Sequence, residues 1–302
     1  MNICLLQGGV SSERDISLIS SAAIAKAINI LNHKLTTIDP QDYPQPEDLI
    51  HAIKQTNCDL VFIGLHGGDG ENGIIQALLQ SAGIKFTGSD YKASAIAMDK
   101  YLSASIAKIH DINVPKQHLF DSIPKDLKQL IEYLNFPIVV KPNSAGSSVG
   151  IHIVNDCDSL IIAMKDAFNY DELVILQEFI KGREITVTIL NNNTLPVVEI
   201  KPKNGFYDYK NKYTKGSTEY ICPAELTDSE SRLVQMYAHK LFNTIGCSIY
   251  GRVDFRYDGK KFYFLEVNTL PGMTELSLSP MAANEIGIDF NCFIEKIILS
   301  SS

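Results

Sequence analysis

The chain has 302 residues, of which 45% are hydrophobic and 21% are charged, which is ordinary for a soluble globular enzyme of two or three domains. Its formal net charge of −8 at pH 7 argues against nucleic acid as the main partner, because phosphate backbones are bound by basic surfaces. No apolar run approaches the ~20 residues of a membrane-spanning helix, so we expect no membrane partner either.

The first ninety residues alternate between strand and helix signals. We expect strands at 2–7, 35–38 and 60–65, and helices at 11–31, 46–55 and 73–82. Ser12, three residues before Asp15, predicts a capping box at the start of the first helix. The N-terminus has no basic segment before its apolar run, so we interpret it as a strand and not as a signal peptide. This βαβ rhythm predicts a Rossmann-like domain at residues 1–89, with a parallel sheet.

Two further α/β units follow. In the first, residues 90–182, we expect helices at 93–110, 125–134 and 156–168 and strands at 115–120, 137–141, 149–154 and 173–179. After residue 183 the strands become longer and antiparallel in character, at 185–190, 194–200, 249–257 and 261–267, with helices at 227–245 and 291–299. The expected class is therefore α/β in three domains, 1–89, 90–182 and 183–302, with α+β character in the last.

The last two strands carry the strongest chemical signal. Side chains alternate along a strand, so Arg252 and Asp254 share one face, and Glu266 and Asn268 share one face. If the two faces coincide, oxygen ligands suited to Mg²⁺ meet beside a guanidinium. Opposing Asp254 to Glu266 requires a β-bulge or a connection of three or five residues, whereas a two-residue Asp258-Gly259 turn would separate them. The alternative is a half-exposed hairpin with ordinary surface charges.

Residues 141–150 form a loop of small residues that begins with Lys141. Glycine and serine let backbone N–H groups approach an anion closely. Ser148 falls in a G-x-S-x-G pattern, but a nucleophile elbow needs a helix after it, and the residues after Gly150 are strand-like. A hairpin tip of this composition beside Lys141 suits a lid over nucleotide phosphates, although a plain mobile hairpin is the simpler interpretation of this segment alone.

Several other segments are candidates for ligand contact. Residues 8–17 and 65–73 follow strands at the edge where α/β sheets bind ligands, and glycines surround His66 in the second. The tyrosine-rich stretch 206–216 predicts a lid. The strand end at 174–184 offers carboxylates to a nucleotide, although surface charges are the simpler interpretation of that segment alone.

Taken together, these residues resemble the D-alanine–D-alanine ligase family of the ATP-grasp superfamily. The similarity runs from end to end, through Gly-Gly-Val-Ser-Ser-Glu13, Leu-His66-Gly, Met98-Asp-Lys100, Lys141 and its loop, Gly-Arg252-Val-Asp254, Glu266-Val-Asn268-Thr and Pro-Gly-Met. The family fold has three domains, with ATP clamped between the central and C-terminal ones. The resemblance implies that ATP phosphorylates the carboxylate of one D-alanine and that the amine of a second attacks the acyl phosphate.

The resemblance also implies roles for the matching residues. Two Mg²⁺ ions, which Mn²⁺ can replace, would be held by Asp254, Glu266 and Asn268. The phosphates of ATP would be held by Lys100, Lys141, Ser147, Ser148 and Lys212, and its adenosine by Glu178, Phe179, Ile180 and Glu184. The D-alanine pockets would contain Glu13, His66, Ser277, Leu278 and Tyr213. Catalysis would involve Glu13, Ser147, Tyr213, Arg252 and Gly272, the last two as the oxyanion site.

Some alternatives stay open in the sequence. In the family, a tyrosine such as Tyr213 goes with a D-amino acid as second substrate and phenylalanine goes with D-lactate, so we expect D-alanine and leave D-serine open. The rivals are another carboxylate–amine ligase of this fold, a ligase that makes the D-lactate ester, and a nucleotide-binding regulator without turnover. A homodimer is expected from the family alone. Six scattered cysteines without a CxxC pair predict reduced thiols in the cytoplasm and no zinc site.

Overall fold

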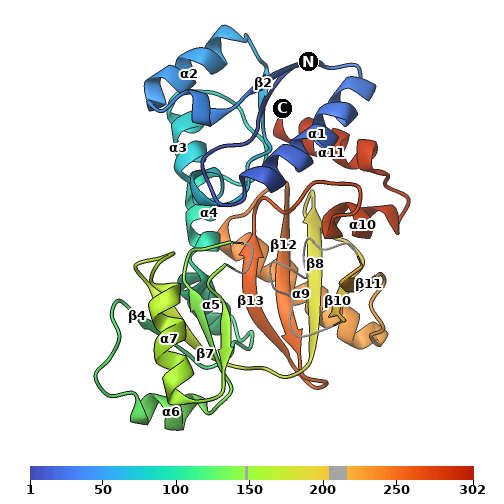
Figure 1. The fold of residues 1–302 in the computed structure, drawn as a ribbon. Coiled ribbons are helices and arrows are strands. Elements are labelled where there is room, and N and C mark those ends of the chain that lie inside the picture. The colour runs from blue at the N-terminus through green and yellow to red at the C-terminus, as the bar shows by residue number, and fades with distance from the viewer. Residues whose placement is uncertain (147–148, 204–215) are drawn as a thin grey trace.

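The computed structural model describes residues 1–146, 149–203 and 216–302. Within these ranges the chain forms three β-sheets, and the N- and C-termini lie close together (Figure 1). The first sheet is parallel, and the other two are antiparallel. The expected α/β class, with a parallel first sheet and antiparallel strands toward the C-terminus, is confirmed. No helix in these ranges is both long and apolar enough to cross a bilayer.

The first sheet has the strand order β2-β1-β3. Its elements are β1 (Asn2–Leu6), α1 (Arg14–Ile30), β2 (Lys34–Ile38), α2 (Pro46–Gln55), β3 (Leu60–Ile63) and α3 (Ile74–Ser81). All four residues of β3 are buried, as expected for a parallel strand covered on both sides. Two helices from the far end of the chain, α10 (Leu278–Asn284) and α11 (Phe290–Ser301), join the core of this sheet.

The predicted capping box at the start of α1 is wrong. The N-cap residue is Glu13, and no side chain caps the helix. The hydroxyl of Ser11 instead donates to the backbone oxygen of His66 at 2.6 Å, which ties the loop before α1 to the loop after β3. The carboxylate of Glu13 is thereby placed at the helix start, next to the carboxyl edge of the sheet.

The second sheet has the strand order β4-β7-β5-β6. Its elements are β4 (Gln117–Phe120), α6 (Lys128–Leu134), β5 (Ile138–Pro142), β6 (His152–Val154), α7 (Cys157–Ala167) and β7 (Val174–Glu178). The single helix expected at 93–110 is two helices, α4 (Tyr91–Met98) and α5 (Lys100–Ile109). The break lies at Asp99, whose side chain accepts a hydrogen bond from the Leu102 backbone at 2.8 Å and so starts a new helix.

The third sheet has the order β11-β10-β8-β12-β13, with β9 paired to β8. Its elements are β8 (Arg183–Leu190), β9 (Asn193–Thr194), β10 (Val198–Pro202), β11 (Thr218–Ile221), α9 (Asp228–Ile245), β12 (Tyr250–Tyr257) and β13 (Phe262–Asn268). The predicted strand 194–200 is thus divided between β9 and β10, and β11 and α10 were not predicted. Helices α4 and α5 pack into the core of this sheet, so they link the expected central and C-terminal parts.

The β12–β13 hairpin has the register that the sequence requires. Asp254 pairs with Glu266 and Arg252 with Asn268, and the register then shifts so that Phe255 pairs with Phe264. The extra residue is Leu265, which makes this a β-bulge. Of the alternatives that the sequence left open, an odd connection or a bulge, the structure has the bulge, which places the four polar side chains on one face of the hairpin.

Candidate active site

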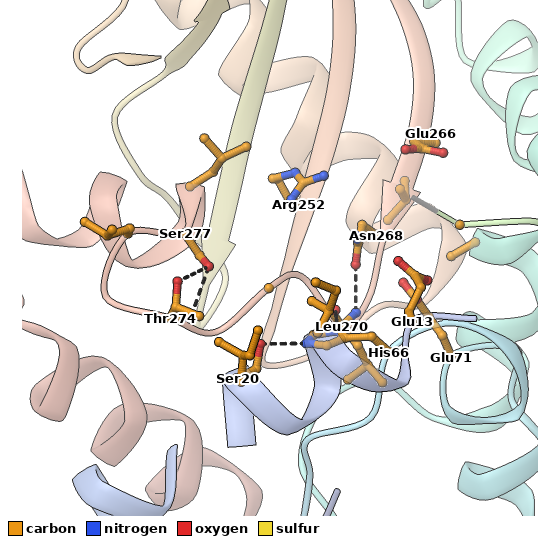
Figure 2. A pocket seen from close by; sticks show the side chains of 18 of the residues that line it. Glu13, Ser20, His66, Glu71, Arg252, Glu266, Asn268, Leu270, Thr274 and Ser277 are labelled. Carbon is orange, nitrogen blue, oxygen red and sulfur yellow. Dashed lines mark hydrogen bonds between the residues drawn. The ribbon is translucent and has the colours of Figure 1, made fainter. Parts of the chain in front are cut away.

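Two cavities meet at this face of the hairpin. The larger, about 480 Å³, lies between α1, the loop after β3, the hairpin and the segment before α10. The smaller, about 130 Å³, lies between the second and third sheets. Lys100 and Glu266 line both cavities. Figure 2 shows Arg252, Glu266 and Asn268 projecting into the larger one, with Glu13 and His66 below them.

The two hairpin carboxylates are each held by a cation. Arg252 donates through Nε and Nη2 to the two oxygens of Asp254, at 2.9 and 2.8 Å. The Nζ atom of Lys100 lies 3.3 Å from Glu266 Oε2. Among the described residues, no three His, Cys, Asp or Glu side chains cluster as a metal site. The donors here are instead two carboxylates and the Asn268 amide oxygen, a hard set that fits Mg²⁺.

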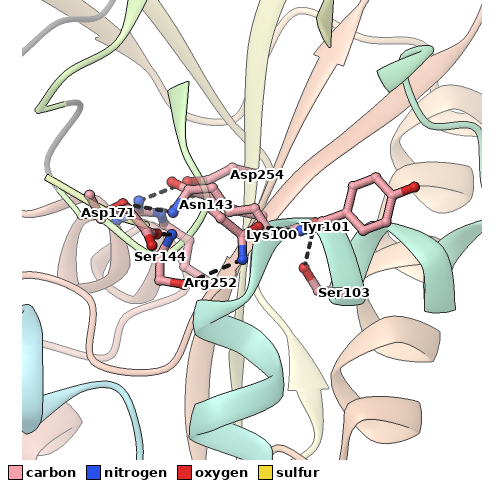
Figure 3. Close-up of polar contacts among 10 residues, drawn as sticks. Lys100, Tyr101, Ser103, Asn143, Ser144, Asp171, Arg252 and Asp254 are labelled. Carbon is pink, nitrogen blue, oxygen red and sulfur yellow. Dashed lines mark hydrogen bonds and ion pairs between the residues drawn. The ribbon is translucent and has the colours of Figure 1, made fainter. Parts of the chain in front are cut away.

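Two buried lysines stand beside these carboxylates. Lys100 is the first residue of α5, and its Nζ donates to the Ala145 carbonyl oxygen at 2.7 Å. Lys141 lies on β5, near enough to Lys100 for the two charges to repel each other. Figure 3 shows how the loop after β5 is fixed to α5: Asn143 accepts from the Tyr101 backbone at 2.9 Å. Burial and repulsion by Lys100 lower the pKa of Lys141 to about 8, and Glu266 partly opposes this. An anion arriving here would restore the charge of Lys141.

The lowered pKa of Lys141 predicts a pH dependence. Only its ammonium form attracts a phosphate, so kcat/KM for ATP should fall as pH rises through about 8, the pKa in the free enzyme. In Lys141→Arg the cation persists at all accessible pH values, and this limb of the profile should disappear. Initial rates between pH 6.5 and 10 would measure it. An unchanged alkaline limb in Lys141→Arg would contradict the assignment.

A pair of carboxyl groups lies at the opposite wall of the larger cavity. Glu13 and Glu71 are both buried, and the backbone N–H of Gly67 donates to Glu71 at 3.1 Å. Burial, together with the charge of Glu13, raises the pKa of Glu71 to about 7. The backbone at Gly146 approaches Glu13 so closely that a Cβ there would overlap its carboxylate. An ammonium group bound here would reduce the repulsion between the two carboxyl groups.

His66 connects two distant parts of the chain. Its Nδ1 lies 2.9 Å from the carbonyl oxygen of Leu270, and its Nε2 lies 3.0 Å from the hydroxyl of Ser20. Burial lowers its pKa to about 4, so the ring is neutral, donating to the carbonyl and accepting from the hydroxyl. His66 lines the cavity, but these contacts also make it a bridge between α1 and the segment after β13.

The segment between β13 and α10 forms another wall of the larger cavity. Gly272, Ser277 and Leu278 all line it. The hydroxyl of Ser277 accepts from the Thr274 backbone at 3.0 Å, which closes a short turn before α10. Four other predicted residues, Ser147, Ser148, Lys212 and Tyr213, lie outside the described residues.

The smaller cavity has the composition of a nucleotide slot. Apolar side chains from both the second and the third sheet line it, namely Val139, Ile151, Ile153, Phe179, Ile180 and Leu265. The carboxylates of Glu178 and Glu184 stand at its edge, where Glu178 accepts from the Lys116 backbone at 3.2 Å. An apolar slot with a few polar groups at one end suits a flat heteroaromatic base.

The structure adds residues that the sequence analysis gave no role. Ser20, Glu71, Thr218 and Tyr220 line the larger cavity, and Gln177 and Arg256 line the smaller one. Arg256 had a usable signal, because it lies two residues beyond Asp254 on the same strand and hence on the same face. Glu71 had none in the periodicity, because it lies in a glycine-rich loop whose position depends on packing with α1.

Comparison with known proteins agrees with this geometry. The family model described as "D-ala D-ala ligase C-terminus" matches residues 104–299, and the one described as "D-ala D-ala ligase N-terminus" matches residues 39–89. A D-alanine–D-alanine ligase of Aquifex aeolicus is 43% identical over 99% of this chain and 100% of its own.

Two solved structures are also similar to the chain. A D-alanine–D-alanine ligase from Bacillus anthracis complexed with ATP is 32% identical, with a TM-score of 0.87 over 100% of this chain and 97% of its own. The VanG D-Ala:D-Ser ligase from Enterococcus faecalis is 29% identical, with a TM-score of 0.82 over 100% of this chain and 99% of its own. The predicted ATP-grasp fold class is confirmed by these full-length similarities.

Proposed function

The chain belongs to the D-alanine–D-alanine ligase family, and we propose that its two adjoining cavities join two D-alanine molecules at the expense of one ATP. The product dipeptide is a precursor of bacterial peptidoglycan. The observation that carries the proposal is the shared wall: Lys100 and Glu266 line both the nucleotide slot and the larger cavity. A phosphoryl group at that wall lies within reach of a carboxylate bound on the other side.

The nucleotide would occupy the smaller cavity with its adenine against Phe179 and Ile180. Lys100 and Lys141 would hold the phosphates, with Ser147, Ser148 and Lys212 as further expected contacts. Asp254, Glu266 and Asn268 would hold Mg²⁺ or Mn²⁺, which neutralises phosphate charge when bound. Phosphoryl transfer needs mainly positioning and charge neutralisation, and these are what a wall of buried cations and carboxylates supplies.

The first D-alanine would lie in the larger cavity with its ammonium group at Glu13. Its carboxylate would then point toward Lys100, where an oxygen attacks the γ-phosphorus and ADP leaves. Glu71 lines the same cavity, and the ammonium would offset the repulsion by Glu13 that helps to raise the pKa of Glu71. The product of this step is D-alanyl phosphate.

The second D-alanine would bind against Ser277 and Leu278, with Tyr213 as a further expected contact. Its neutral amine attacks the acyl carbon, and the carbonyl oxygen becomes an oxyanion. Arg252 and Gly272 both line this cavity, and we assign the guanidinium and the Gly272 backbone N–H to that oxyanion. Collapse of the tetrahedral species expels phosphate, and the amine loses its proton to give the dipeptide.

D-Serine is the second candidate for the second substrate, because the VanG D-Ala:D-Ser ligase shares the fold over the whole chain. We favour D-alanine because Leu278, 6% exposed, contributes an apolar wall beside Ser277. We further propose a cytoplasmic homodimer, since ATP is cytoplasmic and family members are expected to pair. The division into 1–89, 90–182 and 183–302 stays a prediction, and α4, α5, α10 and α11 pack across its limits.

One assay tests the function. Purified protein with ATP, Mg²⁺ and D-alanine should release phosphate and D-alanyl-D-alanine in equal amounts. D-Serine or D-lactate supplied with limiting D-alanine should give less of the mixed product than of the dipeptide. An ATPase activity that ignores D-alanine would refute the ligase proposal, and a preference for the mixed dipeptide would identify a D-alanine–D-serine ligase.

A further inference from the structure

We propose that Arg256 is a positioning residue that fixes the joint between the second and third sheets in the form that binds ATP. The proposal deepens the function above and rests on its assignment of the smaller cavity to the nucleotide. The joint is the segment 179–182, which leads from the end of β7 directly into β8. Phe179 and Ile180 of this segment line the slot, so the path of the joint determines the shape of the slot.

Arg256 makes two hydrogen bonds to the joint and one to the start of β8 just after it. Its Nη2 donates to the Gly182 carbonyl oxygen at 2.8 Å, and its Nε donates to that of Ile180 at 3.3 Å. Its Nη1 donates to Glu184 Oε2, also at 3.3 Å. A guanidinium has donors in a fixed fork, so it can hold several acceptors in one arrangement where an ammonium or a methyl group cannot.

The register of β12 explains why this side chain faces the slot. Along β8 and β12, Arg252 pairs with Thr188, Asp254 with Thr186 and Arg256 with Glu184. Alternate residues share a face, so Arg256 continues the row of Arg252 and Asp254 toward the nucleotide. Its side chain is only 19% exposed, which strengthens its polar contacts compared with a surface ion pair.

A second, independent contact pins the same joint. Gly182 has φ +151°, and a Cβ at this position would overlap the carbonyl oxygen of Tyr257 on β12. The joint therefore lies directly against the end of β12, both through this backbone contact and through the side chain of Arg256. Losing the guanidinium removes these hydrogen bonds from Glu184 and from two carbonyl oxygens. Phe179 and Ile180, which line the slot, are then held less firmly.

The test is Arg256→Met, which keeps the length of the side chain and removes the donors. We expect KM for ATP and the dissociation constant of ADP to rise about ten-fold, with kcat and KM for D-alanine changed less than two-fold. Arg256→Lys should recover only part of the loss, because its ammonium cannot reach all three acceptors at once. Arg232→Met removes the same charge from the exposed face of α9 and should leave all four constants unchanged.

The readouts separate this proposal from the ligase assignment. ADP binding by calorimetry measures the slot even if the wild-type protein makes no dipeptide, in which case only the function above fails. An unchanged ADP affinity in Arg256→Met would overturn the role of Arg256. Equal losses in nucleotide affinity, D-alanine affinity and melting temperature would also overturn it, because they indicate general destabilisation.

Discussion

Glu266→Gln should lower kcat by about 10³-fold or more while the fold stays intact. The side chain is 30% exposed and glutamine has nearly the same shape, so little packing is lost. The substitution removes the negative charge that Lys100 contacts at 3.3 Å and that we assign to a Mg²⁺ ion. Steady-state rates at several Mg²⁺ concentrations, together with thermal melting, would measure the effect.

A matched control separates the effect of the position of Glu266 from the effect of losing one negative charge. Glu285→Gln makes the same chemical change at an exposed residue just after α10 and should leave kcat unchanged. Near-normal turnover of Glu266→Gln at saturating Mg²⁺ would reject the metal assignment. A large fall in melting temperature, shared by both variants, would show instead that the substitutions damage the fold.

The hairpin shows how much of a site simple strand arithmetic can predict. Alternation places Arg252 and Asp254 on one face, and the parity of residue numbers requires a bulge or an odd connection before Asp254 can oppose Glu266. The structure has the bulge at Leu265. These inferences need only local geometry, because the pleat fixes where each side chain points once the strands are known.

Other features depended on contacts that the sequence does not display. The helix break at Asp99 was missed because the apolar periodicity continues across it, although aspartate favours a cap over a helix interior. The failed capping box at Ser12 has a similar cause, since the neighbouring Ser11 bonds a loop 55 residues away. Such choices are decided by tertiary packing, which outweighs local preference.

The electrostatics of the site were likewise beyond local inference. The raised pKa of Glu71 depends on burial and on Glu13, which lies 58 positions earlier in the chain. Counting along the strand places Arg256 on the correct face. It does not predict the hydrogen bonds to the carbonyl oxygens of Ile180 and Gly182, because these lie in the segment between β7 and β8. The sequence predicts which side chains can act together, and the packing of the sheets determines their charge states and partners.

Replacing Arg252 with lysine should lower dipeptide synthesis by about 10²–10³-fold and should affect the second chemical step more than the first. Lysine keeps the positive charge but loses the fork, which holds both oxygens of Asp254 at 2.8 and 2.9 Å. Acyl phosphate that forms but is not captured by the amine is lost to water. The ratio of phosphate released to dipeptide formed should therefore rise above one.

That ratio distinguishes the two hairpin residues. Loss of Glu266 impairs phosphoryl transfer, so phosphate and dipeptide should fall together and stay equal. In Arg252→Lys at saturating Mg²⁺, the acyl phosphate should still form but should react more slowly with the amine. Phosphate release should therefore exceed dipeptide formation. Arg232→Lys on α9 supplies the control. Equal falls of both products in Arg252→Lys would contradict the oxyanion role. Arg252 would then be assigned to the phosphates, because its loss would slow the first step as much as the second.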